Sequence, residues 1–391
     1  MKPIPARHSV LPSPLFVAAL LALVILSLPV APGATWDGQR LGPEEIADLA
    51  GDLPTRRGER DRFGRRIEQA LEREPVSPRG VPAVRVDLAY GKHPRNVLDL
   101  WAVEAEPAAP LAVFLHGGGF QRGDKALLRD SRLLDQLLDA GISVAAVNYR
   151  FSHQHPEGVA GSLRDIARAV QFLRHQAEEL GIDPARFAAF GGSAGGAAAL
   201  WLAFYEELAD AGSDDPVARQ STRMRCVGAM ATPSTLDLLQ WPGILGIDEQ
   251  DLERAARSFG IANLAELRTA ESASLRAKLD IAAWMSPGDP PFFVRNNDPG
   301  GVPRAVDAMA HHPNHARVLL QRAAEVGVEA IVFAPAIGIE PRSGEDLVAF
   351  FTRHLFADGN DQATRACGRT NTVANGVATC IRESVRTAAE S

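Results

Sequence analysis

A chain of 391 residues, 46% of them hydrophobic and 23% charged, is long enough to bury a large core and differs in composition from disordered proteins. Its net charge of -7, with lysines and arginines scattered along the chain, gives no electrostatic basis for a nucleic-acid partner. We therefore expect one large globular domain with appendages, and nucleic-acid-binding proteins are excluded.

The first segment, residues 1–34, is predicted to be a signal peptide. Lys2 and Arg7 precede an apolar run over residues 15–28, and small residues such as Ala31 and Ala34 follow it. An uncleaved membrane anchor is the alternative, but the run falls short of the roughly 20 residues that a spanning helix needs. We expect a secreted or periplasmic protein with no stable membrane span after cleavage.

The next segment, residues 35–80, is charged and rich in helix-favouring residues until Pro75, Pro78 and Gly80 end it. A helical N-terminal preface is predicted here. The sequence gives no indication of its purpose.

The main domain is expected over residues 81–357. Short apolar segments alternate there with helical patterns, as where Leu163, Ile166 and Val170 recur at helical spacing within residues 162–180. Eight strands are predicted at residues 84–89, 97–101, 111–115, 143–147, 187–190, 227–231, 292–294 and 330–333. Strands that alternate with helices predict an α/β fold, with a mostly parallel eight-stranded sheet and helices on both faces.

A helical insertion, residues 235–283, separates two successive strands and is too long for a plain connection. We predict a cap over the carboxyl edge of the sheet, in which Trp241 and Ile244 shape an acyl pocket. A longer helical crossover without a gating role is the alternative.

The last segment, residues 358–391, is rich in Gly, Asn, Thr and Ala without periodicity, and a flexible tail is predicted. The three cysteines of the chain are Cys226, Cys367 and Cys380. A disulfide between the last two suits an oxidising compartment, and three unpaired thiols are the alternative. Neither spacing resembles a zinc site, so no metal and no cofactor are expected.

The segment GGSAG at residues 191–195 follows an apolar strand and precedes an apolar helix, which is the context that a G-x-S-x-G turn requires. A serine on such a turn adopts a strained backbone, and glycines two residues away on either side let the chains pass without collision. Ser193 is therefore the expected nucleophile, at a helix N-terminus where the dipole favours negative charge.

A second motif, HGGGF at residues 116–120, also follows an apolar strand. Glycines allow backbone N–H groups to approach a substrate carbonyl, and such donors form an oxyanion hole with the amide after the nucleophile. We expect Gly118, Gly119 and Ala194 to be the donors and His116 to organise the loop. A phosphate-binding loop is disfavoured, because the Lys-Ser/Thr pair and the dinucleotide-binding spacing are absent.

Together with GDK at residues 123–125, NYR at 148–150 and GIDPARFAAFGGSAGG at 181–196, this motif resembles the hormone-sensitive-lipase-like esterases and the bacterial feruloyl and acetyl-xylan esterases. The resemblance covers residues 84–356 and is looser beyond Ala231. It implies an α/β-hydrolase fold, a serine nucleophile, an acid after the seventh strand and a histidine after the eighth. The implied substrates are small acyl esters, often on plant polysaccharides.

The acid and the histidine depart from that pattern. After the seventh strand Asp298 is the best match for the acid, and a turn aspartate is the alternative. After the eighth strand Ile339 stands where a histidine is expected. The remaining source of a base is the cluster at residues 311–315, from which His312 or His315 is the candidate; histidines that merely begin a helix are the alternative.

Two functions therefore compete. One is a serine hydrolase that cleaves carboxylic esters of small acyl groups or carbohydrates through a Ser193 acyl-enzyme. The other is a catalytically impaired relative that binds a carbohydrate, an acyl ligand or a partner, because a serine without a base is a poor nucleophile. A histidine ring nitrogen within about 3.2 Å of the Ser193 hydroxyl favours the hydrolase.

Overall fold

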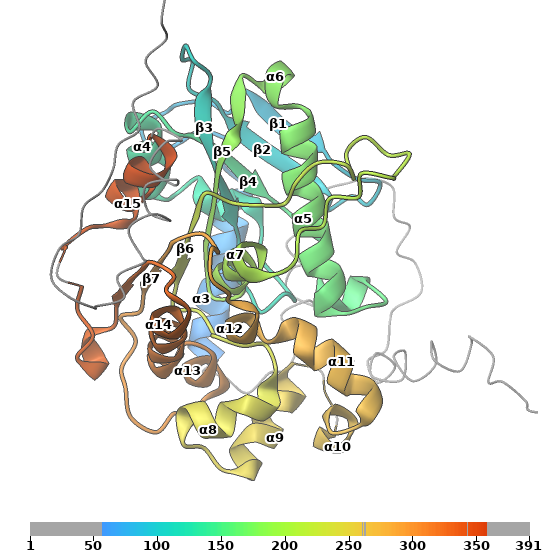
Figure 1. Ribbon diagram of the computed structural model, residues 1–391, viewed down its shortest axis with the longest axis vertical. Coiled ribbons are helices and arrows are strands. Elements are labelled where there is room, and N and C mark those ends of the chain that lie inside the picture. The colour runs from blue at the N-terminus through green and yellow to red at the C-terminus, as the bar shows by residue number, and fades with distance from the viewer. Residues whose placement is uncertain (1–56, 260, 262, 342, 358–391) are drawn as a thin grey trace, which may run out of the picture. The chain divides into compact units, whose positions relative to one another are not determined.

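The computed structural model describes residues 57–357 apart from 260, 262 and 342, with side chains from Arg62 onward (Figure 1). The compact unit of this described chain ends at Leu355. The predicted signal peptide, the preface up to residue 56 and the tail with Cys367 and Cys380 lie outside the described residues. Secretion and the disulfide stay predictions.

An eight-stranded sheet in the order β1-β2-β4-β3-β5-β6-β7-β8 carries the fold. Its strands are β1 (Arg85–Ala89), β2 (Val97–Trp101), β3 (Ala109–Leu115), β4 (Ser143–Val147), β5 (Ile182–Gly192), β6 (Cys226–Met230), β7 (Phe292–Arg295) and β8 (Ala330–Phe333). The two pairings that involve β2 are antiparallel, and all others are parallel. The mostly parallel sheet predicted from the alternation of strands and helices is confirmed.

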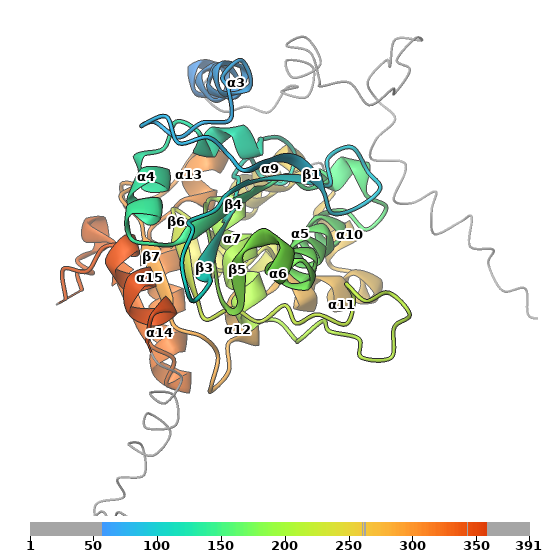
Figure 2. The ribbon, with the colours of Figure 1, turned by 90° about the horizontal axis from the view of Figure 1, so that it is seen from above.

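Helices cover both faces of the sheet. One face carries α5 (Val159–His175), α6 (Ala177–Leu180), α7 (Ala194–Phe204), α12 (Ile281–Trp284) and α14 (Asn314–Val326). The other face carries α4 (Arg132–Asp139) and α15 (Leu347–Leu355). Figure 2 shows α4 and α15 on the side of the strands away from α5 and α6. Every residue of α7 is buried, so this helix forms the centre of the larger core.

The predicted insertion between β6 and β7 is helical. It holds η3 (Leu238–Gln240), α8 (Trp241–Leu245), α9 (Glu249–Ser258), α10 (Leu264–Leu267) and α11 (Ala270–Leu279) before α12 returns to the sheet. Buried side chains such as Trp241 and Leu252 form a separate small core with Val306 and Met309 of α13 (Val306–Ala310). In Figure 1, α8 and α9 lie below α13, while α10 and α11 lie to their right. A gating role for them stays a prediction.

The predicted helical preface is represented by α3 (Arg57–Leu71). Its buried side chains, Ile67 and Ala70, face the short helix η1 (Lys125–Leu128), against which α3 packs. The remaining short helices are η2 (Ser152–Gln154) and η4 (Pro335–Ile337). Within the described part of the chain, no helix is long and apolar enough to cross a membrane.

Candidate active site

Ser193 lies on the turn between β5 and α7, in a backbone conformation that few non-glycine residues adopt. Its φ of 54° and ψ of -122° place it in a strained region, as expected for a serine raised on a tight strand-to-helix turn. The Ser193 N–H donates to the Met230 carbonyl oxygen at 2.9 Å, which ties the turn to the end of β6. The residue forms the N-cap of α7, and Ala194 begins the helix.

Glycines beside the turn allow this conformation because backbone passes very close to them. A Cβ on Gly191 or Gly195 would overlap with the Leu115 carbonyl oxygen of β3, whereas one on Gly192 would come no closer than 3.7 Å to Met230 O. The two glycines that the close approach requires are therefore those two residues before and after Ser193, as predicted from the sequence.

His311 contacts the Ser193 hydroxyl. Its Nε2 lies 2.7 Å from Ser193 Oγ, which is within hydrogen-bond distance. His311 is the residue at the C-terminal end of α13, between β7 and β8. The ring reaches Ser193 from the connection before the last strand, and not from the loop after it, where Ile339 stands.

Asp307 lies one helical turn before His311 on α13 and contacts the other ring nitrogen. Its Oδ1 is 3.4 Å from His311 Nδ1, slightly long for a hydrogen bond in a site without substrate. A ring protonated on Nδ1 places that proton towards Asp307 and leaves Nε2 free to accept from the serine hydroxyl. The Ser193 hydroxyl, the His311 ring and the Asp307 carboxylate thus lie in a row, with the ring between the other two groups.

The electrostatics of this row favour a protonated His311. Burial lowers the pKa of His311, but the hydrogen bond and the charge of Asp307, together with the charge of Asp298, outweigh burial and leave the pKa above its usual value. The hydrogen bond to His311 correspondingly lowers the pKa of the Asp307 carboxyl, and the positive charge of Arg122 adds to that effect.

Asn296 fixes the position of the His311 backbone. Its side-chain amide donates to the His311 carbonyl oxygen at 2.8 Å, and its own N–H donates to Phe333 O of β8 at 2.8 Å. The predicted acid, Asp298, donates its backbone N–H to Asn296 Oδ1 and makes no ion pair with His311 within 4.0 Å among the described contacts. The carboxylate closest to the ring is therefore Asp307, and not Asp298.

The two histidines named from the sequence lie elsewhere. His312 Nε2 binds the Gly301 carbonyl oxygen at 2.7 Å. His315 is fully buried between Ser234 Oγ and Met309 O, and burial lowers its pKa to about 3. The expectation that His312 or His315 would reach Ser193 is corrected: their neighbour His311 does so. One-turn spacing of Asp307 and His311 was the sequence signal for this pair, because such residues share a helix face.

The HGGGF turn at residues 116–120, for which the sequence predicts an oxyanion hole, is called the oxyanion turn below. Gly118 and Gly119 have φ angles of 117° and 64°, which glycine adopts without strain. A Cβ on Gly117 would lie 3.5 Å from the Ser193 Cβ, so the turn runs directly beside the serine. Gly118 and Gly119 follow Gly117 in this turn, and Ala194 follows Ser193 in the chain; their role as oxyanion donors stays a prediction. On the insertion side, the Phe259 ring lies 3.8 Å from where a Gly119 Cβ would be.

His116 and Arg95 form hydrogen bonds with the backbone of this turn and of the segment that follows it. The Arg95 guanidinium donates to Gly123 O at 3.0 Å and lies 3.3 Å from His116 Nε2, while His116 Nδ1 lies 2.9 Å from Gly117 O. Burial, aided by the charge of Arg95, lowers the pKa of His116 to about 3, so the ring is neutral. One tautomer, protonated on Nδ1, satisfies both contacts. His116 therefore organises the turn.

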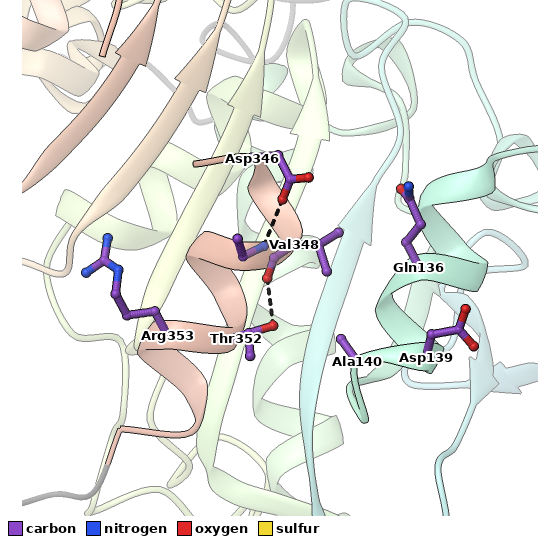
Figure 3. A pocket seen from close by; sticks show the side chains of 8 residues that line it. Gln136, Asp139, Ala140, Asp346, Val348, Thr352 and Arg353 are labelled. Atoms are coloured by element: carbon purple, nitrogen blue, oxygen red, sulfur yellow. Dashed lines mark hydrogen bonds between the residues drawn. The ribbon is translucent and has the colours of Figure 1, made fainter. Parts of the chain in front are cut away.

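An open hollow of about 670 Å³ lies between α4 and α15, and none of the residues around Ser193 and His311 lines it (Figure 3). Its basic lining residue, Arg353, is already paired with Glu329 and Glu345. Among the residues that the structure describes, no group of three or more His, Cys, Asp and Glu side chains is placed to hold a metal ion. Cys226 is buried and unpaired.

Comparison with protein families gives a match of residues 98–299 to the family model BD-FAE, which is more than half of the chain. The chain belongs to the BD-FAE family. The BD-FAE match contains both glycine motifs, Ser193 and Asp298, but it ends before Asp307 and His311. The ring that contacts the serine thus comes from a segment outside the matched range.

Relatives of this BD-FAE protein are esterases. A probable isoprenylcysteine alpha-carbonyl methylesterase of Arabidopsis thaliana is 31% identical over 37% of the chain, and the fumonisin B1 esterase of Sphingopyxis macrogoltabida is 28% identical over 58%. The chain spans 29% and 38% of the lengths of these two proteins.

Solved structures share the fold. A truncated carbohydrate esterase from gut microbiota has a TM-score of 0.55 at 17% identity, covering 69% of this chain and 95% of its own. Esterase B from Lactobacillus rhamnosis has a TM-score of 0.52 at 16% identity, covering 83% of this chain and 94% of its own. At these identities the likeness establishes the α/β-hydrolase fold.

Proposed function

We propose that the protein is a serine hydrolase that cleaves carboxylic esters through an acyl-enzyme on Ser193. The observation that carries the proposal is the 2.7 Å contact between His311 Nε2 and Ser193 Oγ. This distance suits proton transfer from the hydroxyl to the imidazole. Asp307 on the other side of the ring supplies the orientation and charge that such a base needs.

In the proposed reaction His311 accepts the Ser193 proton as Oγ attacks the ester carbonyl carbon. The negative charge that develops on the carbonyl oxygen is received by the N–H groups of Gly118, Gly119 and Ala194. The imidazolium then gives its proton to the departing alcohol as the ester bond breaks. Water, deprotonated by His311, then attacks the acyl carbon. As the bond from that carbon to Ser193 Oγ breaks, the imidazolium returns the proton to Oγ and the acid is released.

For the substrate we propose esters of small acyl groups, including those carried by carbohydrates. Two relatives are esterases by name, one of them a methylesterase. The Phe259 ring beside Gly119 supports a short acyl chain, because it occupies space next to the proposed oxyanion site. The proposal needs no cofactor and no metal, since serine, histidine and backbone amides supply each proton transfer and charge contact.

The alternative was a relative without turnover, and its motivation was the lack of a base near Ser193. His311 removes that motivation, because a ring nitrogen lies within the 3.2 Å that the sequence argument set as its criterion.

The test is hydrolysis of p-nitrophenyl acetate and butyrate by the purified protein. We expect turnover that Ser193→Ala reduces by several orders of magnitude and that Ser274→Ala, an exposed serine of α11, leaves unchanged. A fluorophosphonate probe is expected to label wild type at Ser193 alone. Wild-type protein that neither turns over these esters nor takes the label would refute the proposal.

A further inference from the structure

Helix α3 packs on the chain segment that directly follows the oxyanion turn. Phe63, Ile67 and Ala70 are spaced by four and three residues and so share one face of the helix. Ile67 and Ala70 are 4% and 1% exposed, and the helix contacts η1, which begins at Lys125. This buried face gives α3 a fixed position on the segment between residues 120 and 130.

The C-terminal end of α3 is bound through a buried charge network. Arg129 Nη1 donates to the Arg73 carbonyl oxygen at 2.9 Å, just beyond the helix end. Arg129 Nη2 donates to Asp99 Oδ2 at 2.8 Å, and Asp99 on β2 is fully buried. A charged hydrogen bond therefore connects the end of α3 to β2, the second strand of the sheet.

The N-terminal half of α3 contacts Arg122, two residues after the oxyanion turn. The guanidinium carbon of Arg122 lies 5.3 Å from the centre of the Phe63 ring, within the range of a cation–π contact. The Arg122 N–H donates to the Gly118 carbonyl oxygen at 3.2 Å, and a Cβ on Gly118 would overlap with Arg122 O. The Arg122 backbone is therefore packed against Gly118, and a shift of that backbone would shift Gly118 as well.

Arg122 also connects α3 with the row of side chains at Ser193. Its positive charge acts on Asp307 and contributes to the lowered pKa of that carboxyl. The charged groups that act on Asp307 are thus His311 on its own helix and Arg122 from the segment after the turn. Phe63 is the α3 residue that contacts the Arg122 side chain, and Arg122 in turn acts on Asp307 and contacts Gly118.

We propose that helix α3 is a positioning element of the Ser193 site: Phe63 holds Arg122, and Arg122 holds the Gly118 amide in the place where an oxyanion would form. The inference rests on the proposed esterase function and assigns a purpose to the preface. Phe63 acts through Arg122 and touches no substrate.

The experiment compares Phe63→Ala with Phe63→Tyr, which retains an aromatic face, and with Gln69→Ala on the exposed side of α3. Full loss of an oxyanion donor costs about a hundredfold or more in kcat, so displacement of one by Phe63→Ala is expected to cost roughly tenfold. KM is expected to change less than twofold. Phe63→Tyr should restore kcat, and Gln69→Ala should match wild type.

Hydrogen exchange provides a readout that does not depend on turnover. In Phe63→Ala we expect faster exchange for peptides covering residues 117–123, with unchanged exchange in β6 and β7. Faster exchange confined to α3, or an unchanged kcat in a variant whose α3 is released, would overturn the inference while leaving the esterase proposal intact. Wild-type protein without Ser193-dependent turnover would refute the esterase proposal first, and the inference with it.

Discussion

At the scale of single residues, the pKa of His311 decides the pH at which the site can work. Burial opposes protonation of the ring, but Asp307 and Asp298 outweigh it, so the pKa lies above the ordinary histidine value of about 6.5. The base must be neutral to accept the serine proton. Activity should therefore fall as the pH drops through a midpoint above about 6.5 in a profile of kcat/KM.

Replacing Asp307 by Asn should shift that profile in a defined direction. Without the carboxylate, burial dominates and the pKa of His311 falls, so the acid limb moves to lower pH. At the same time kcat should fall by roughly a hundredfold or more, since the tautomer and orientation of the ring are lost.

The matched control is Asp298→Asn, which removes the more distant carboxylate. It should lower kcat less than tenfold and move the acid limb less than Asp307→Asn does, because the charge of Asp298 raises the pKa of His311 less than Asp307 does. A larger effect of Asp298→Asn on both measurements would show that Asp298, as the sequence indicated, is the acid.

The sequence motifs indicated the candidate serine and glycines, but not the histidine that lies beside the serine. Ser193, Gly118 and Gly119 stand in motifs whose spacing fixes their local geometry, so the sequence alone places them together. His311 comes to Ser193 through tertiary packing of α13, a helix of five residues. Its neighbours His312 and His315 had the same residue type, and only the folded chain distinguishes the three.

At the scale of secondary structure, the closest approach in the site is that of β3 to the turn before α7. A Cβ on Gly195 would overlap with the Leu115 carbonyl oxygen, and this is rigid backbone that cannot move aside. Gly195→Ala should therefore lower the free energy of unfolding by about 1–3 kcal/mol or more and abolish ester turnover. Denaturant unfolding and p-nitrophenyl acetate hydrolysis measure the two effects.

Gly192→Ala is the matched control, because the nearest atom to a Cβ there is 3.7 Å away. It should leave the unfolding midpoint unchanged. Equal destabilisation by the two substitutions would mean that the turn depends on glycine flexibility, and not on the approach of β3.

Apolar runs in the sequence predicted the positions of the strands well, but they predicted the ends of strands and helices less accurately. β2, β4 and β8 begin and end as predicted. The helix predicted over residues 162–180 is divided at Gln176 into α5 and α6. Leu173, Ala177 and Leu180 are buried on both sides of the break, so the apolar pattern continues across it and does not reveal it.

At the scale of the whole molecule, one buried carboxylate joins the preface, the sheet and the segment after the oxyanion turn. Asp99 on β2 binds Lys125 Nζ at 2.6 Å and Arg129 Nη2 at 2.8 Å, and Arg129 in turn binds the end of α3. The sequence contains no local signal for this network, because its members are brought together from three distant segments. The purpose of the preface was unreadable for the same reason.

Asp99→Ala should therefore destabilise the molecule strongly and affect α3 first. The buried Arg129 would lose its carboxylate partner and Lys125 would keep only Asp87, and breaking such a network typically costs about 3–5 kcal/mol. Denaturant unfolding is expected to show that loss, and hydrogen exchange should be faster in α3 than elsewhere. Glu253→Ala removes an exposed pair with Arg257 and should leave both measurements at wild-type values. A similar response of the two variants would mean that Asp99 does not connect α3 to the sheet.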